Sequence, residues 1–289
     1  MPSIKKIGRF CPTDDEGYII NDAHIEKVQP MFMEVIQEIK NTCCELLQDD
    51  LHSVYIRGSI PRGIGIEGIA DIDVIIVVRK DPKLIDLSWR KKLEVQSLQK
   101  FNCITGVELS FYSEKEVINS KSFSFISFMI QTHGVCICGE DVTSSLPKYK
   151  VSQELAHEHL IQLGKQIGQA RKELIHNKGV EDIEDCCRWI MKIIIRSGLA
   201  LTIEREGLYS RDLYPAYELF SKHFPEQEKN MRKALQYVIE PINDINEILL
   251  FLSTFGEWLI ERAADFLNNI DNQNNIKILC KQKRGEKVK

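Results

Sequence analysis

The chain has 289 residues, of which 43% are hydrophobic, and its formal net charge is −4. This length is sufficient for two domains, and the apolar content predicts packed cores rather than disorder. The negative charge disfavours an extended nucleic-acid surface, and no apolar run is long enough to span a membrane.

The first ten residues, MPSIKKIGRF, do not have the pattern of a signal peptide. We therefore expect a cytoplasmic protein that does not bind membranes. The nine cysteines fit reduced thiols in that compartment better than a disulfide framework. Their spacing also predicts no structural zinc site.

Up to residue 139 the sequence alternates strand and helix patterns behind an N-terminal arm. Pro30 either kinks the first helix or marks its true start. Ser113 and Glu116 form a capping box for a later helix. The predicted elements are an arm or short hairpin (1–22), a helix (23–49), strands (52–56 and 70–78), a helix (81–101), a strand (103–112), a helix (113–132) and a strand (134–139).

From residue 152 onward only helical periodicity remains, which predicts an antiparallel bundle. Its expected helices are 153–178, 182–206, 211–223, 226–239 and 242–268, with glycine and proline at several of the breaks. The fold class is therefore α+β: a mixed sheet flanked by helices, followed by an all-α domain. We place the domains at 1–148 and 149–289, and we expect the basic tail 281–289 to be mobile.

Two acidic residues, Asp71 and Asp73, open the apolar strand at 70–78. Side chains alternate along a strand, so both carboxylates point to the same face. Two such carboxylates repel each other, and a divalent cation removes that penalty. Alternatively, they simply cap the entrance of the strand.

A Gly-Ser turn, Gly58-Ser59, lies upstream of this acidic strand. Such a turn exposes backbone N–H groups and a hydroxyl, which are the donors that a phosphate needs. Turn formation alone is the other interpretation of Gly58. The combination of a Gly-Ser turn with paired acids is more specific than either feature.

Gly58-Ser59, the spacer 60–70 and Asp71-Ile72-Asp73 together resemble the signature of the DNA polymerase β-type nucleotidyltransferase superfamily. The closest likeness is to small enzymes that adenylylate antibiotics and carry a C-terminal helical domain. Two positions depart from the usual pattern: Arg57, where a small or apolar residue is more common, and Ala70, where many members have serine.

The resemblance implies a third carboxylate on a later strand, and Glu108 is the candidate. Within 103–112, Glu108 and Ser110 alternate with apolar Val107 and Leu109. Glu108 would face the aspartates if the two strands were neighbours. Its implied role is metal ligand, general base, or both; an exposed edge-strand glutamate is the alternative.

The implied reaction is transfer of a nucleoside monophosphate, most directly AMP from ATP, to a hydroxyl of a small molecule, with release of pyrophosphate. Asp71, Asp73 and Glu108 would hold two Mg²⁺ ions, with Mn²⁺ as a substitute. Gly58 and Ser59 would bind the β and γ phosphates of the triphosphate.

Three cationic residues are further candidates for phosphate binding. Arg62 lies in the loop after the Gly-Ser turn, where a solvated loop arginine is the alternative. Lys192 and Arg196 share one face of a largely apolar helix, Cys186–Leu201, together with Arg188. The resemblance implies that such residues lie in an interdomain cleft near the triphosphate; otherwise the face is an exposed edge with glutamate partners.

Two other functions remain open. The acceptor could instead be a protein side chain, a tRNA end or another nucleotide. The chain could also be a non-catalytic nucleotide-binding or antitoxin-like partner, although such a module has no need of three repelling carboxylates.

Overall fold

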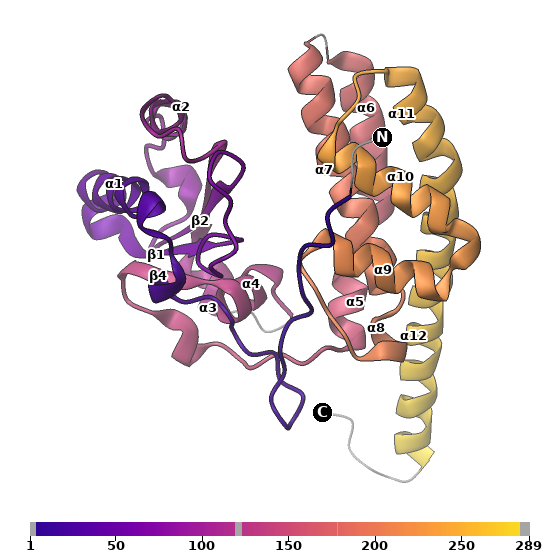
Figure 1. Ribbon diagram of the computed structural model, residues 1–289. Helices are drawn as coiled ribbons and strands as arrows, with labels where there is room; N and C mark the ends of the chain where they lie inside the picture. Colours follow the sequence, from indigo (N-terminus) through magenta and orange to yellow (C-terminus); the bar gives the residue numbers. More distant parts are fainter. Residues whose placement is uncertain (1–3, 119–122, 178, 284–289) are drawn as a thin grey trace. The chain divides into compact units, whose positions relative to one another are not determined.

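The computed structural model describes residues 4–118, 123–177 and 179–283, with side chains up to residue 270 (Figure 1). The chain divides into two compact units. One is Pro12–Lys150, and the other joins Met1–Cys11 to Val151–Lys289. The division therefore falls two residues beyond the predicted boundary, and the N-terminal segment belongs with the helices rather than with the sheet.

The first unit contains a four-stranded mixed sheet with the strand order β3-β2-β1-β4. Strand β1 pairs antiparallel with both β2 and β4, whereas β2 and β3 are parallel. The α+β class and the mixed sheet are thus confirmed. The strands are β1 (Leu51–Arg57), β2 (Asp71–Val78), β3 (Gly106–Ser113) and β4 (Val135–Gly139).

Helices α1 and α2 pack on one face of this sheet and form its main core. Helix α1 spans Pro30–Leu47, so Pro30 marks the start of the helix rather than a kink. Helix α2 spans Arg90–Lys100 and contacts β3. The core on this side joins the inner residues of both helices to alternate strand residues, among them Phe32, Val35, Ile39, Val54, Ile56, Ile72, Val74, Ile76, Leu93, Val107 and Leu109.

The opposite face of the sheet carries the other set of alternating side chains. On β2 this set runs Asp71, Asp73, Ile75 and Val77, of which the last two are fully buried. Helices α3 (Glu114–Ile118) and α4 (Phe125–His133) contact β2 and β1 respectively. The aspartates therefore occupy the start of a strand whose later residues are buried on this face.

Local capping explains where two elements begin. The predicted capping box is confirmed, because Glu116 Oε2 accepts from Ser113 N at 2.7 Å while Ser113 Oγ accepts from Glu116 N at 3.3 Å. The predicted helix 81–101 is wrong in its first half. The cap at Asp81 starts only a 3₁₀ turn, η3 (Pro82–Leu84). The Asp86 carboxylate then accepts from Ser88 N, a local bond that competes with helix formation. The remaining short turns of this unit are η1 (Ile25–Lys27), η2 (Gln48–Asp50) and η4 (Val142–Ser145).

The second unit is a bundle built around α7. Helix α7 contacts α5, α6, α9, α10 and α12. Its buried residues include Cys187, Ile190, Met191 and Ile194, which confirms the expected buried helix. The helices are α5 (Gln153–Leu160), α6 (Leu163–His176), α7 (Val180–Ala200), α8 (Ile203–Glu206), α9 (Leu213–His223), α10 (Glu228–Ile239), α11 (Ile245–Phe251) and α12 (Glu257–Lys283), with a 3₁₀ turn η5 (Pro225–Gln227) and a π-helical turn η6 (Leu252–Gly256).

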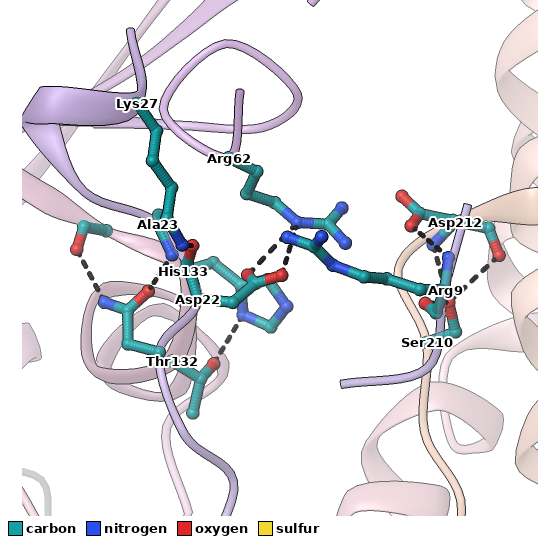
Figure 2. Close-up of polar contacts among 11 residues, drawn as sticks. Arg9, Asp22, Ala23, Lys27, Arg62, Thr132, His133, Ser210 and Asp212 are labelled. Carbon is teal, nitrogen blue, oxygen red and sulfur yellow. Dashed lines mark hydrogen bonds and ion pairs between the residues drawn. The ribbon is translucent and has the colours of Figure 1, made fainter. Parts of the chain in front are cut away.

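Backbone hydrogen bonds attach the N-terminal segment to this bundle. Cys11 N donates to Tyr209 O at 2.7 Å, and Arg9 N donates to Asp212 Oδ2 at 2.9 Å. Ser210 Oγ also donates to Arg9 O at 2.7 Å (Figure 2). Such bonds leave no periodic trace in the sequence, which is why the segment was expected to lie with the sheet.

None of the helices in the part of the chain that the structure describes combines the length and the apolar character needed to cross a membrane. Of the predicted basic tail 281–289, residues 281–283 end α12. Residues 284–289 lie outside the described residues.

Candidate functional site

Strand register places three charged residues in one row across the sheet. Arg57 on β1 is the antiparallel partner of Asp73 on β2. Asp73 is in turn the parallel partner of Glu108 on β3. Directly paired residues of neighbouring strands project to the same face. The sequence predicted Glu108 beside the aspartates on the condition that the strands adjoin, and β2 and β3 do adjoin.

Asp71 lies two residues before Asp73 and therefore on the same face, opposite Gly106 of β3. Asp71 and Glu108 are exposed, whereas the side chain of Asp73 is only 16% exposed. Ser110 Oγ donates to Glu108 Oε1 at 3.3 Å. The three predicted acids thus share one face at the start of the two parallel strands, with Asp73 the most enclosed.

The carboxylate of Asp73 lies beside both Arg57 and Gly58. Its Oδ1 lies 3.1 Å from Nη2 of Arg57, forming an ion pair. Its Oδ2 lies 2.8 Å from the place that a Cβ on residue 58 would take. Gly58 also has φ +91°, a conformation that side chains other than glycine rarely adopt. Glycine is therefore required here for two independent reasons.

The loop after Gly58 is held in a compact turn. Gly63 N donates to Ile60 O at 3.0 Å, and Ile64 N donates to Ser59 O at 3.1 Å. The segment that precedes η1 also contacts this turn, because His24 N donates to Pro61 O at 2.8 Å. Ser59, the predicted phosphate ligand, is partly exposed at its start.

Arg62 forms a buried ion pair and does not lie on the surface of the loop. Its Nε lies 3.1 and 3.2 Å from the two carboxylate oxygens of Asp22 (Figure 2). The two side chains are only 5% and 12% exposed. This environment favours a role in holding the loop to the arm over the predicted contact with phosphate, and it also excludes the alternative of a solvated loop arginine.

The acids suit a hard divalent cation by chemistry but not by their present placement. Carboxylate oxygens are the ligands that Mg²⁺ prefers, and register brings Asp73 and Glu108 together. Nevertheless, among the described residues no group of three or more His, Cys, Asp or Glu side chains is placed to hold a metal ion. The ion pair of Arg57 with Asp73 occupies one of the oxygens that such a site needs.

The other predicted phosphate ligands, Lys192 and Arg196, lie on α7 in the helical unit, and both are partly buried. Arg188, one turn earlier, pairs with Asp185 at 2.6 Å. The predicted contact of Lys192 and Arg196 with the triphosphate stays a prediction.

Near Arg196 lies a polar pair that the sequence did not reveal. His159 Nε2 lies 3.1 Å from the hydroxyl oxygen of Tyr209. Tyr209 as a whole is 1% exposed. Burial, and then the positive charges of Arg211 and Arg196, lower the pKa of His159 to about 3. His159 is therefore neutral at physiological pH, and the two arginines create a positive potential around it.

A shallow hollow of about 270 Å³ opens elsewhere on the helical unit, between α6 and α7. It contains none of the predicted site residues. Its lining is Glu173, Asn177, Asp182, Asp185, Cys186 and Trp189.

Sequence reasoning missed two residues of the sheet unit that determine the geometry of the site. Asp22 was assigned only to an arm, and Arg57 was noted only as a departure from a motif. The ion pair of Arg57 depends on the antiparallel pairing of β1 with β2, which the sequence analysis did not predict. The partner of Arg62 carried no signal, because 40 residues separate it from Asp22.

Two comparisons with known proteins were made for the sequence. The sequence matches no protein-family model, and none of the curated proteins matches it. The function must therefore be argued from the row of charged residues and the glycine turn beside it.

Proposed function

We propose that the protein is a nucleotidyltransferase that moves a nucleoside monophosphate, most directly AMP from ATP, to a hydroxyl of a small molecule. The observation that supports this most strongly is the register of β2 with β3, which pairs Asp73 with Glu108. Residues so far apart in sequence need not meet in this way. Their meeting beside the Gly58-Ser59 turn joins a cation-binding face to a phosphate-binding turn.

In the proposed reaction, the acceptor hydroxyl oxygen forms a bond to the α-phosphorus. The bond between the α-phosphorus and the oxygen that bridges the α and β phosphates breaks. Pyrophosphate leaves with that oxygen, and the hydroxyl proton passes to Glu108 or to solvent. Ser59 and the neighbouring N–H groups bind the leaving phosphates. Asp71, Asp73 and Glu108 would hold two Mg²⁺ ions, or Mn²⁺ in their place, and these ions would supply positive charge that offsets the negative charge of the triphosphate.

Acceptor chemistry is open within this proposal. A protein side chain, a tRNA end or another nucleotide could supply the hydroxyl in place of a small molecule. The net charge of −4 disfavours an extended nucleic-acid contact, and this is why a small molecule is preferred.

A second function, non-catalytic nucleotide binding as an antitoxin-like partner, is favoured by one observation. Asp73 is already neutralised by Arg57, and no group of described residues is placed to hold a metal ion. A protein of this kind would bind ATP without releasing pyrophosphate.

The test compares the wild type with D71N/D73N by calorimetric titration of ATP in the presence of Mg²⁺. We expect at least about a tenfold loss of affinity, because each charged interaction contributes about 1.5–3 kcal/mol. The matched control is E45Q/D49N, which removes two exposed carboxylates of the same unit. Equal affinity in D71N/D73N and the control would refute the proposed site.

A second measurement separates the two functions. Pyrophosphate release is followed with ATP and panels of small metabolites, antibiotics, tRNA and proteins. Release that requires one acceptor class identifies a nucleotidyltransferase and its substrate. Tight ATP binding without release for any class would favour the binding partner.

A further inference from the structure

Arg57 is the last residue of β1 and directly precedes the Gly58-Ser59 turn. It therefore lies between the two parts of the proposed site. Its guanidinium contacts Asp73 on one side, and its backbone leads into the phosphate-binding turn on the other. The side chains of Arg57 and Asp73 are 20% and 16% exposed, so the pair is enclosed but still within reach of solvent.

The position of Arg57 disfavours a divalent cation on the same oxygen. A guanidinium Nη2 lies 3.1 Å from Asp73 Oδ1, and a cation there would meet a like charge at close range. The second oxygen, Oδ2, lies 2.8 Å from the place that a Cβ on residue 58 would take, and glycine leaves this place open. Consequently, Arg57 and a metal ion compete for the negative charge of Asp73, most directly at Oδ1.

When Arg57 leaves Asp73 in the proposed complex, the cations occupy the neighbouring acids Asp71 and Glu108, and the triphosphate is the anion that remains for Arg57. A guanidinium binds phosphate oxygens in a two-pronged geometry and stays charged at any physiological pH. Phosphates bound at the adjacent Gly58-Ser59 turn would lie next to the arginine. One side chain thus has two alternative anionic partners, carboxylate and phosphate, on neighbouring sides.

We propose, on the basis of the proposed function, that Arg57 is an exchangeable counter-ion that couples metal binding to nucleotide binding. In the metal-free protein it neutralises Asp73. When a divalent cation takes Asp73, Arg57 moves to the phosphates of the nucleotide. Each ligand therefore strengthens the binding of the other, as thermodynamic linkage requires, and the metal alone binds weakly.

The test measures Mn²⁺ binding without nucleotide in the wild type, R57M and R57K, by calorimetry and by the electron paramagnetic resonance signal of free Mn²⁺. We expect R57M to bind Mn²⁺ about tenfold more tightly than the wild type, because a competing charge has been removed. R57K retains the charge and should stay close to the wild type. The matched control R79M removes an exposed arginine at the end of β2 and should leave the affinity unchanged.

The second arm measures ATP binding in the presence of Mg²⁺ by the same variants. We expect R57M to bind ATP about tenfold less tightly, so that its two affinities change in opposite directions. Unchanged Mn²⁺ affinity in a folded R57M, judged by circular dichroism, would overturn the counter-ion role. A gain in Mn²⁺ affinity with unchanged ATP affinity would overturn the transfer to phosphate.

This design keeps the failure of the inference distinct from the failure of the proposed function. If neither the wild type nor R57M binds ATP, the nucleotidyltransferase proposal falls. The Mn²⁺ arm still decides whether Arg57 masks Asp73, because it requires no nucleotide.

Discussion

Two arginine–aspartate pairs involve the same loop, one at its start and one within it, and they have different environments. Arg62 and Asp22 are 5% and 12% exposed, and they join the loop to the N-terminal arm. Arg57 and Asp73 are 20% and 16% exposed, and they stand in a row with the exposed Glu108. The same kind of ion pair therefore has two roles. The enclosed Arg62–Asp22 pair fixes the loop, and the more open Arg57–Asp73 pair can exchange partners.

The surroundings of each pair explain the difference. Near Asp22, one backbone bond, from His24 N to Pro61 O, makes a second connection to the loop beside the ion pair. Around Asp73, the neighbours on the other side are two further carboxylates, Asp71 and Glu108, which would repel it if Arg57 were absent. The Arg62–Asp22 pair, which has a second connection beside it, is therefore a structural element. A pair beside like charges is poised for a second cation.

The largest effect is expected from breaking the enclosed pair. D22N removes the negative charge of the carboxylate that Arg62 Nε contacts at both oxygens. Loss of one partner of a buried ion pair lowers the free energy of unfolding by about 3 kcal/mol. We expect lower stability in urea and faster hydrogen exchange at the amides of Gly63 and Ile64 in the loop. The exposed Asp15 provides the control D15N. If loop exchange is the same in both variants, the pair does not hold the loop.

A smaller effect is expected at the glycine between the two pairs. G58A places a methyl group 2.8 Å from Asp73 Oδ2 in a residue with φ +91°. We expect a loss of about 2 kcal/mol in the free energy of unfolding, of which backbone strain is about half.

The control for this variant is G17A in the same unit. Gly17 has φ +83°, but no atom lies within 4 Å of the place that an alanine methyl group would take, so it reports the strain alone. Urea denaturation of both variants gives the contact contribution by difference. Equal losses would mean that Asp73 yields to the methyl group at no cost.

The smallest effect on stability is expected from breaking the more open pair. R57M should lower the free energy of unfolding by about 1 kcal/mol or less, because a partly exposed ion pair contributes little. Urea denaturation of R57M beside D22N tests the comparison directly. A loss as large as that of D22N would make both pairs structural and would remove the contrast between them.

Much of the fold was predictable because its signals are local. The apolar run of β2, the capping box at Ser113 and the buried face of α7 each follow from residue spacing within one element. The helix expected over 81–101 was overestimated because a proline turn and the Asp86 side chain both offer the backbone another partner. Short-range competition of this kind is not visible in periodicity.

The site was predictable only in part, because it depends on pairing between strands. The shared face of Asp71 and Asp73 follows from alternation along one strand. The alignment of Asp73 with Glu108, and of Arg57 with Asp73, depends on register that no single strand encodes. The partner of Arg62 lies in an arm whose sequence has no regular pattern, so its contribution could not be anticipated.

The parallel pairing of β2 with β3 has a consequence for how the chain tolerates change. On β3, Glu108 stands between Val107 and Leu109, which are buried in the main core. Sliding this strand by a single position would turn both apolar residues outward as it carried the glutamate inward. Any insertion or deletion that misaligned the acidic side chains would therefore be penalised first as a folding defect, so that hydrophobic packing safeguards the spacing on which the chemistry depends.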